Sequence, residues 1–256
     1  MQPSHQGTTR FSNRVADYVR SRPRYPHGIL DILRSDAGLT NSMVMADIGS
    51  GTGFSAEPFL QNGNIVYGVE PNADMRSAAE TLLASYPNFR SVSGTAEATT
   101  LAERSIDLIV AGQAFHWFDP PRSRVEFRRV LRDDGPVALI WNTLQEDATP
   151  FMRAYMNLLH QFGRDFKEVV HTNVGQAQLQ AFYGGDFVKR TLPNEQRFDR
   201  EGLRSRLLSS SYTPPAGHPN HEPMLCELDR IFEENQEGGE VRMVYETEIY
   251  VGRLHD

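Results

Sequence analysis

The stretch "MVMADIGSGTG", residues 43–53, joins a short apolar run to an aspartate and to three glycines at alternate positions. Glycine weakens the interior of a helix or strand, so three of them in five residues indicate a tight turn or close approach to a ligand. The apolar run is typical of a buried strand, and the residues after the turn suit the start of a helix. Asp47 to Gly53 would then lie at the carboxyl end of a strand, where open α/β sheets bind their ligands.

Short apolar runs and helical stretches alternate along the chain on both sides of this turn. The expected strands cover residues 43–49, 64–70, 105–112 and 136–142, with a weaker candidate at 89–94. An amphipathic helix is expected at residues 27–35, before the first strand, and crossover helices are expected at 55–63, 73–86 and 120–133, the last of them capped by Asp119. This alternation predicts a doubly wound α/β fold as far as about Asn142.

The chain is less regular after residue 142. Helices are expected at 150–163, 200–210 and 225–235, and strands at 186–192 and 241–251, with a loop at 214–223. In the last strand Val241, Met243 and Tyr245 alternate with polar residues, which favours an antiparallel strand with one exposed face. Cys226 lies in an apolar helical context and is expected in the core.

Composition limits the function classes. The 256 residues carry a net charge of -7, which offers no global electrostatic footprint for nucleic acid. The single cysteine excludes an internal disulfide and suits a reducing compartment. No secretory signal and no apolar run of membrane-spanning length is visible, so we expect a cytoplasmic protein with no membrane partner.

Two cofactor classes use a glycine turn in this position. A dinucleotide site follows the pattern G-x-G-x-x-G, which counted from Gly49 and Gly51 requires glycine at position 54, where this chain has Phe54. The third glycine falls at Gly53 instead. The resulting pattern, acid-x-G-x-G-x-G, resembles motif I of the class I S-adenosylmethionine-dependent methyltransferases. A plain turn, or an NAD-dependent dehydrogenase on the same fold, is the alternative.

Further stretches resemble the same family in the same order. They are "VEPNADMRSAA" (69–79), "SGTAEATTL" (93–101), "IDLIVAGQAFHWFD" (106–119) and "YVRSRPRYP" (18–26). Together they resemble the small-molecule subgroup known as methyltransferase type 11, which includes trans-aconitate methyltransferase-like proteins. The resemblance covers essentially the whole chain, although residues 143–256 match only in outline. It implies a Rossmann-like seven-stranded sheet with the last strand antiparallel, helices on both faces and additional helices that form a lid.

The resemblance also implies a domain plan and a set of site residues. One methyltransferase domain is expected over residues 1–256, with a lid at 1–35, the cofactor-binding core at 43–142 and a substrate-side part at 143–256. The residues expected to bind S-adenosyl-L-methionine are Tyr18, Arg22, Asp47, Gly49, Ser50, Gly51, Thr52, Gly53, Glu70, Pro71, Met75, Thr95, Ala96, Glu97 and Gln113. Within this set, Glu70 is expected at the ribose, and Met75, Ala96 and Glu97 at the adenine. Tyr25, His116 and Trp117 are expected to contact the substrate.

His116 is the candidate catalytic residue. An imidazole with its ordinary pKa could deprotonate an oxygen or nitrogen nucleophile near neutral pH. The alternative is that His116 packs with its aromatic neighbours and only shapes the pocket. Gln113 is expected either to position a ligand or to be an ordinary polar strand end.

The charged groups outside the glycine turn leave alternatives open. Arg22 or Arg24 could bind a substrate carboxylate, or the segment could simply be solvated. A basic, aromatic segment could also contact RNA. His218, His221 and Glu222 lack the spacing of a preformed metal site, so no metal is expected.

We therefore expect an S-adenosylmethionine-dependent methyltransferase that acts on a small molecule, at a carboxylate or a hydroxyl, as a monomer or a homodimer. An RNA or protein methyltransferase, or a non-catalytic cofactor-binding module, is the alternative.

Overall fold

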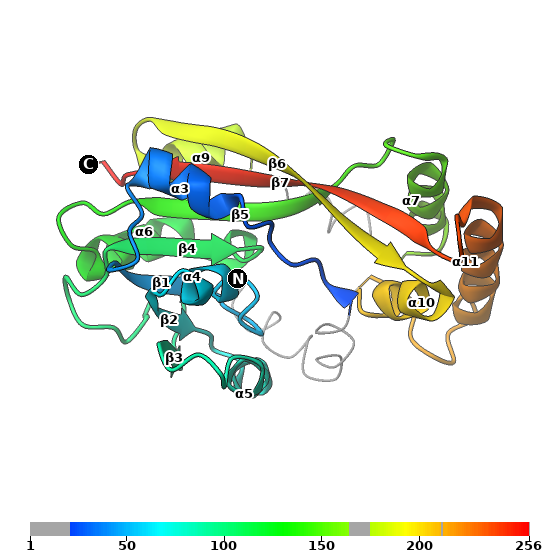
Figure 1. The fold of residues 1–256 in the computed structure, drawn as a ribbon, viewed down its shortest axis with the longest axis horizontal. Coiled ribbons are helices and arrows are strands. Elements are labelled where there is room, and N and C mark those ends of the chain that lie inside the picture. Colours follow the sequence, from blue (N-terminus) through cyan, green and yellow to red (C-terminus); the bar gives the residue numbers. More distant parts are fainter. Residues whose placement is uncertain (1–20, 164–174, 211, 256) are drawn as a thin grey trace.

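A seven-stranded sheet forms the centre of the computed structural model, which describes residues 21–163, 175–210 and 212–255 (Figure 1). The strand order is β3-β2-β1-β4-β5-β7-β6. Strands β1 to β5 are parallel, and β7 is antiparallel to both of its neighbours, β5 and β6. The strands are β1 (Val44–Ile48), β2 (Ile65–Val69), β3 (Phe89–Val92), β4 (Leu108–Gly112), β5 (Val137–Leu144), β6 (Phe187–Phe198) and β7 (Val241–Gly252). The predicted sheet, with its last strand antiparallel, is confirmed.

Apart from α9, the helices also follow the predicted order, with ends that differ by a few residues. They are α3 (Ile29–Ala37), α4 (Glu57–Gln61), α5 (Ala73–Leu82), α6 (Pro120–Val130), α7 (Pro150–Phe162), α9 (Gln176–Tyr183), α10 (Arg200–Leu208) and α11 (His221–Asn235). Helix α6 begins as expected, because the Asp119 side chain accepts a hydrogen bond from the backbone N–H of Arg122. None of the helices in the described ranges is long and apolar enough to cross a membrane.

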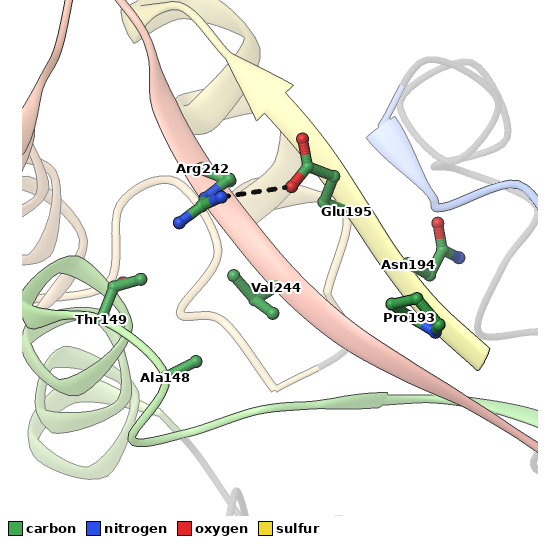
Figure 2. A pocket seen from close by; sticks show the side chains of 7 residues that line it. All are labelled: Ala148, Thr149, Pro193, Asn194, Glu195, Arg242 and Val244. Carbon is green, nitrogen blue, oxygen red and sulfur yellow. Dashed lines mark ion pairs between the residues drawn. The ribbon is translucent and has the colours of Figure 1, made fainter. Parts of the chain in front are cut away.

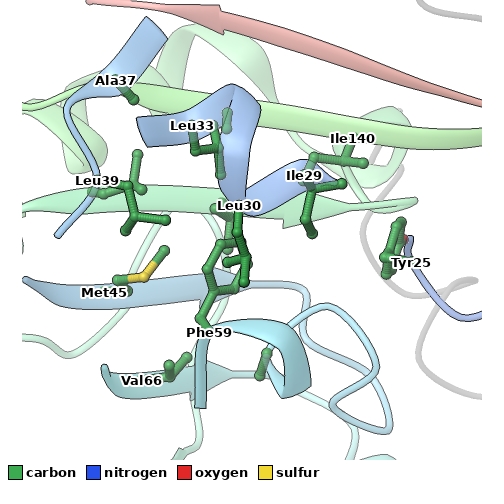
Figure 3. Close-up of a cluster of buried hydrophobic side chains, with 14 of the residues drawn as sticks. Tyr25, Ile29, Leu30, Leu33, Ala37, Leu39, Met45, Phe59, Val66 and Ile140 are labelled. Atoms are coloured by element: carbon green, nitrogen blue, oxygen red, sulfur yellow. The ribbon is translucent and has the colours of Figure 1, made fainter. Parts of the chain in front are cut away.

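The side chains of the central strands point alternately to the two faces of the sheet and contribute to a separate core on each face. On one face, Leu33 of α3 and Phe59 of α4 pack against Met45 and Ile140 (Figure 3). On the other face, Phe127 of α6 and Phe182 of α9 pack in a second cluster of buried residues. The period of two along a strand divides each strand between the two cores, which is why the sequence shows nearly continuous apolar runs.

A third core lies where the long ribbon of β6 and β7 extends beyond the rest of the sheet. Helices α7, α10 and α11, here called the helical cap, pack around this end of the ribbon (Figure 1). Leu159, Leu207 and Leu228 contribute one buried side chain from each helix, and Met243 contributes one from β7. The cap therefore has apolar packing of its own, separate from the two cores of the main sheet.

The predictions for two elements need correction. Strand β6 was expected to end at residue 192, but it continues to Phe198 because its polar residues pair with β7 along their whole length. Helix α9 was not predicted, because glutamines interrupt its apolar pattern and its burial depends on packing against α6 and the sheet.

The predictions around α11 also need correction. The helix begins at His221, so residues 221–223 are not part of the expected loop. His221 is buried, and its Nδ1 lies 2.9 Å from the carbonyl oxygen of Pro214. Cys226 is exposed rather than part of the core, because the buried positions Met224 and Leu228 lie on the opposite side of the helix. Across the described ranges, no three metal-ligating side chains come together.

The two sides of α11 should respond differently to truncation. Leu228→Ala leaves a cavity in the third core and should lower the free energy of unfolding by about 2–5 kcal/mol. Cys226→Ala removes an exposed side chain and should change it by less than about 0.5 kcal/mol. Urea unfolding of both variants measures the difference. Equal losses of stability would contradict the placement of Cys226 on the exposed side.

Candidate functional site

The glycine turn continues directly from the end of β1. The backbone N–H groups of Gly49 and Ser50 both donate to the carbonyl oxygen of Val69, at 2.8 and 3.2 Å, and so tie the turn to the end of β2. All three glycines have positive φ, which is 54° at Gly51. A Cβ atom at Gly51 would meet nothing within 4 Å, whereas one at Gly49 would lie 2.6 Å from the Ala114 methyl group. The backbone at Gly51 therefore faces open space.

Asp47 lies beneath this turn and is fully buried. Its Oδ2 accepts a hydrogen bond of 2.7 Å from the Ser55 hydroxyl, whereas its Oδ1 has no partner among the described residues. Burial raises the pKa of Asp47 to about 7, the Ser55 hydrogen bond opposes this rise, and the charge of Glu70 adds to it. The buried hydroxyl of Thr52 likewise lacks a partner within the described chain. These two free oxygen atoms fit a ligand that brings hydrogen-bond donors, such as an ammonium group.

Glu70 joins the turn to the next helix. Its Oε2 accepts from the backbone N–H of Gly51 at 3.1 Å, and its Oε1 accepts from the N–H of Asn72 at 2.8 Å. Burial raises the pKa of Glu70, and these two hydrogen bonds partly oppose the rise. The Asn72 side chain in turn caps α5 by accepting from the N–H groups of Asp74 and Met75. The acid predicted to bind ribose is thus held beside Gly51.

The segment after β3 lies near the start of α6. The Glu97 carboxylate accepts a hydrogen bond of 2.8 Å from the backbone N–H of Asp119, the N-cap residue of that helix. Ala96 is buried in the second core, whereas Thr95 and Pro71 are exposed. Met75 is buried near the start of α5. Their predicted contacts with adenine stay predictions.

Gln113 has a strained backbone at the end of β4, with a φ of 54°. Its side-chain Nε2 donates to the carbonyl oxygen of Asn142 at 3.0 Å, so it bridges the ends of β4 and β5. A short 3₁₀ helix, Phe115–Trp117, follows. Phe115 is buried, and Trp117 remains 47% exposed beside His116, with 4.8 Å between their ring centroids.

His116 does not have the ordinary pKa on which its expected role as a base depended. Burial lowers the pKa of His116 to about 4, because the charged imidazolium loses its water. The side chain is therefore neutral at neutral pH, and a base of such low pKa is weak. This geometry suits a neutral imidazole in the wall of the site, which was the alternative interpretation.

The amino-terminal segment crosses the end of β4. A Cβ atom at Gly112 would lie 2.5 Å from the Tyr25 hydroxyl, so the ring of Tyr25 rests directly on this strand end. Arg24 forms an ion pair of 2.5 Å with Glu57 and stacks 3.7 Å from the centre of the Phe54 ring. The Arg24 guanidinium is thus already engaged within the chain. Tyr18 lies outside the described residues.

Arg22 contacts the helical cap. Its Nη2 lies 3.4 Å from the carbonyl oxygen of Ser209, just after α10. The expectation that Arg22 or Arg24 binds a substrate carboxylate stays a prediction.

A cavity of about 530 Å³ lies elsewhere, between the β6–β7 ribbon and the start of α7 (Figure 2). In it Arg242 Nη1 lies 3.6 Å from Glu195 Oε2. Its lining residues are Ala148, Thr149, Pro193, Asn194, Glu195, Arg242 and Val244. None of the residues predicted to bind cofactor or substrate lines this cavity.

Three residues of the site were not predicted: Ser55, Asn72 and Asn142. The first two have a local signal, because Ser55 follows the glycine turn and Asn72 stands where an N-cap is expected. No local sequence signal marks Asn142, because its contacts with Gln113 and Thr247 depend on strand pairing.

Comparisons with known proteins agree with this geometry. The profile of a methyltransferase domain matches residues 46–139. A methyltransferase-like protein of Schizosaccharomyces pombe is 27% identical over 93% of this chain and 92% of its own length. A methyltransferase of Mycobacterium bovis is 36% identical, and the match covers 53% of each chain.

Solved structures share the fold. A protein of Anaeromyxobacter dehalogenans, proposed to be a type II methyltransferase, superposes with a TM-score of 0.63 at 20% identity, covering 91% of this chain and 98% of that one. The YcgJ protein of Bacillus subtilis superposes with a TM-score of 0.56, also at 20% identity, and covers 90% of this chain and 100% of its own. The domain match and the methyltransferase relatives support a class I S-adenosylmethionine-dependent methyltransferase, and the strand order and the solved structures show that the chain has the fold of that class.

Proposed function

We propose that this methyltransferase transfers the methyl group to a small-molecule acceptor, at a carboxylate or hydroxyl oxygen, and holds its cofactor on the turn at 49–53. The observation that carries the cofactor placement is the free Oδ1 of buried Asp47 beneath a turn that is open at Gly51. S-adenosylmethionine brings an ammonium and a carboxylate on its methionyl end and an electrophilic methyl group on its sulfonium.

The residues around the turn have complementary chemistry. Asp47 Oδ1 and Thr52 Oγ1 are suited to receive the ammonium group, and the backbone N–H groups of the turn are suited to the carboxylate. Glu70 would exchange its contact with Gly51 for hydroxyl groups of the ribose. Methyl transfer is an in-line displacement, so the main tasks of the protein are alignment and exclusion of water.

Tyr25, His116 and Trp117 are proposed to form the wall against the acceptor. Tyr25 rests on the end of β4, and the other two residues follow that strand. A carboxylate acceptor is already ionised at neutral pH and needs no base, which agrees with the low pKa of His116. The net charge of -7 favours a small molecule over RNA, the alternative acceptor.

Gly51→Ala should remove cofactor binding while the fold is kept. The added methyl group meets no protein atom within 4 Å, so it would occupy the space proposed for the ligand. S-adenosylhomocysteine should bind at least about tenfold more weakly by calorimetry, a loss of about 1.4 kcal/mol.

Gly38→Ala is the matched control. Gly38 ends α3 with a φ of 68° and also has nothing within 4 Å of its Cβ position, so the backbone strain of the two variants is similar. This control should bind S-adenosylhomocysteine as the wild type does. Unchanged binding in both variants would contradict the placement of the cofactor at Gly51.

Binding of S-adenosylhomocysteine should strengthen with pH through the pKa of Asp47. If the ionised carboxylate receives the ammonium, the fraction able to bind rises about tenfold between pH 6 and pH 8 for a pKa of about 7. Asp47→Asn should bind weakly with no such dependence. Calorimetry at several pH values tests this, and the same pH dependence in wild type and variant would refute the role of Asp47.

The stability of the unliganded protein should change with pH in the opposite direction to the affinity for S-adenosylhomocysteine. The pKa of Asp47 is raised above its unfolded value of 3.8, so the native state holds this proton more tightly. The contribution to stability is therefore complete below about pH 4 and is lost as the pH rises through about 7. Thermal unfolding should show wild type losing stability relative to Asp47→Asn across this range.

A further inference from the structure

A guanidinium group is buried in the helical cap without an acidic partner. Arg206 of α10 is only 3% exposed. Its Nε donates to the Tyr245 hydroxyl at 3.3 Å and its Nη1 donates to the Ser210 hydroxyl at 3.1 Å. No carboxylate of the described residues forms an ion pair with it. A buried cation that only neutral hydroxyls contact is costly, which is typical of a site that receives an anion.

A second buried polar group lies beside Arg206. Tyr155 of α7 is fully buried, and within the described chain its hydroxyl has no hydrogen-bond partner. Burial raises the pKa of Tyr155, and the groups that act on it electrostatically are Arg206, Tyr212, Tyr245 and Arg22, none of which is acidic at neutral pH. The hydroxyl is therefore a protonated donor. The Arg206 guanidinium and the Tyr155 hydroxyl, both hydrogen-bond donors, are thus buried near one another, and no carboxylate of the described residues pairs with Arg206.

The position of this cluster along the β6–β7 ribbon connects it with the methyl-transfer site. One face of the ribbon is apolar under α3, at Leu192 and Ile249, and apolar again in the cap, at Phe198 and Met243. Between these apolar ends the same face is polar.

Two groups of hydrogen-bonded side chains lie along this polar part of the face. Gln113 donates to the carbonyl oxygen of Asn142, Asn194 donates to the Asn142 side chain at 3.0 Å, and Tyr245 donates to Gln196 at 2.9 Å. Thr247, which pairs with Asn142 across β5 and β7, lies two residues from Tyr245 on the same face.

The distance along the ribbon from Tyr245 to the end of β4 indicates how long a ligand must be to reach both places. Tyr245 lies four residues beyond Ile249, which pairs with Ile140 and through it with Gly112 at the end of β4. At about 3.3 Å per residue, the displacement along the strand is about 13 Å. The segment from Ser21 to Tyr25 covers the same interval, because the Ser21 carbonyl oxygen accepts from Gln196 at 3.3 Å and Tyr25 rests on Gly112.

We propose that Arg206, together with the hydroxyl of Tyr155, binds a carboxylate of the methyl acceptor and so selects organic acids that extend from the cap toward the end of β4. This inference rests on the proposed function, because it adds an anchoring point to that same site. A guanidinium and a tyrosine hydroxyl together offer a carboxylate charge-assisted and neutral hydrogen bonds.

Tyr155→Phe is the sharpest test, because it removes only a hydroxyl that has no partner in the described chain. It should leave the melting temperature unchanged or raise it, and should weaken acid binding about tenfold or more. The probes are dicarboxylates from succinate to sebacate, and 3-phenylpropanoate with its uncharged amide. Each is titrated by calorimetry into protein saturated with S-adenosylhomocysteine.

Arg206→Met provides a second variant. It should abolish binding of the acids while the fold is kept, because a buried charge without an acidic partner is replaced by an apolar side chain. The amide should not bind to any form of the protein. A large loss of melting temperature in this variant, with acid binding unchanged in Tyr155→Phe, would assign Arg206 a structural role and overturn the proposal.

Tyr183→Phe is the matched control in the second core. Tyr183 is also fully buried, but its hydroxyl lies within hydrogen-bond distance of the carbonyl oxygens of Val137 and Tyr250, at 3.2 and 3.0 Å. Its loss should cost about 0.5–1.5 kcal/mol of stability with no change in acid affinity.

The same titrations separate this inference from the proposed function. If S-adenosylhomocysteine binds but none of the acids binds the wild type, the carboxylate site is wrong and the cofactor site stands. If S-adenosylhomocysteine does not bind, the proposed function itself fails. Equal affinity of an acid for wild type, Tyr155→Phe and Arg206→Met would overturn the carboxylate site.

Discussion

The pairing of β7 between β5 and β6 is the constraint on which the rest of the structure depends. β7 pairs with β5 over eight residues and with β6 over twelve, so the ribbon of β6 and β7 continues where β5 has ended. An isolated two-stranded ribbon is only marginally stable in water. The helical cap supplies the missing packing: α7, α10 and α11 bury the apolar side chains at the far end of the ribbon. The long strands thus give the molecule a third core and leave a polar stretch between that core and the main sheet.

The glycine turn shows the opposite balance, because it contains buried polar atoms without hydrogen-bond partners among the described residues. Asp47 is buried with one oxygen free, Thr52 has a buried hydroxyl without a partner in the described chain, and Gly51 is held at a positive φ beside open space. The two buried oxygen atoms without hydrogen bonds are unfavourable in a protein without a ligand. Glu70 partly compensates, because its carboxylate accepts the N–H of Gly51. The cap has a similar arrangement: Arg206 is buried with hydroxyl groups as its partners, and the buried Tyr155 hydroxyl has no hydrogen-bond partner among the described residues.

Several features of the fold could be predicted from the sequence because they depend on neighbouring residues. The strand runs, the N-cap at Asp119 and the turn at 49–53 all have local patterns, and the antiparallel last strand followed from a resemblance carried by such patterns. The errors concern properties that depend on distant contacts. β6 is longer than predicted because pairing with β7 overrides the polar character of residues 193–197. The exposure of Cys226 was mispredicted because an apolar helical context does not specify which side of the helix is covered. The pKa of His116 depends on how far the folded chain excludes water from its ring.

The sequence by itself therefore determined the fold class and the position of the glycine turn, because a glycine turn at the end of a strand is a short-range arrangement that seven residues specify. Only the tertiary structure decided which polar groups are buried without partners. Sheet pairing and helix packing bring together the neighbours that determine the chemistry of these groups. The groups are Asp47 with Ser55, Gln113 with Asn142, and above all Tyr155 with Arg206 and Tyr245. The polarity of a side chain can be read in the sequence, but the removal of its water and the supply of its partners depend on the complete fold.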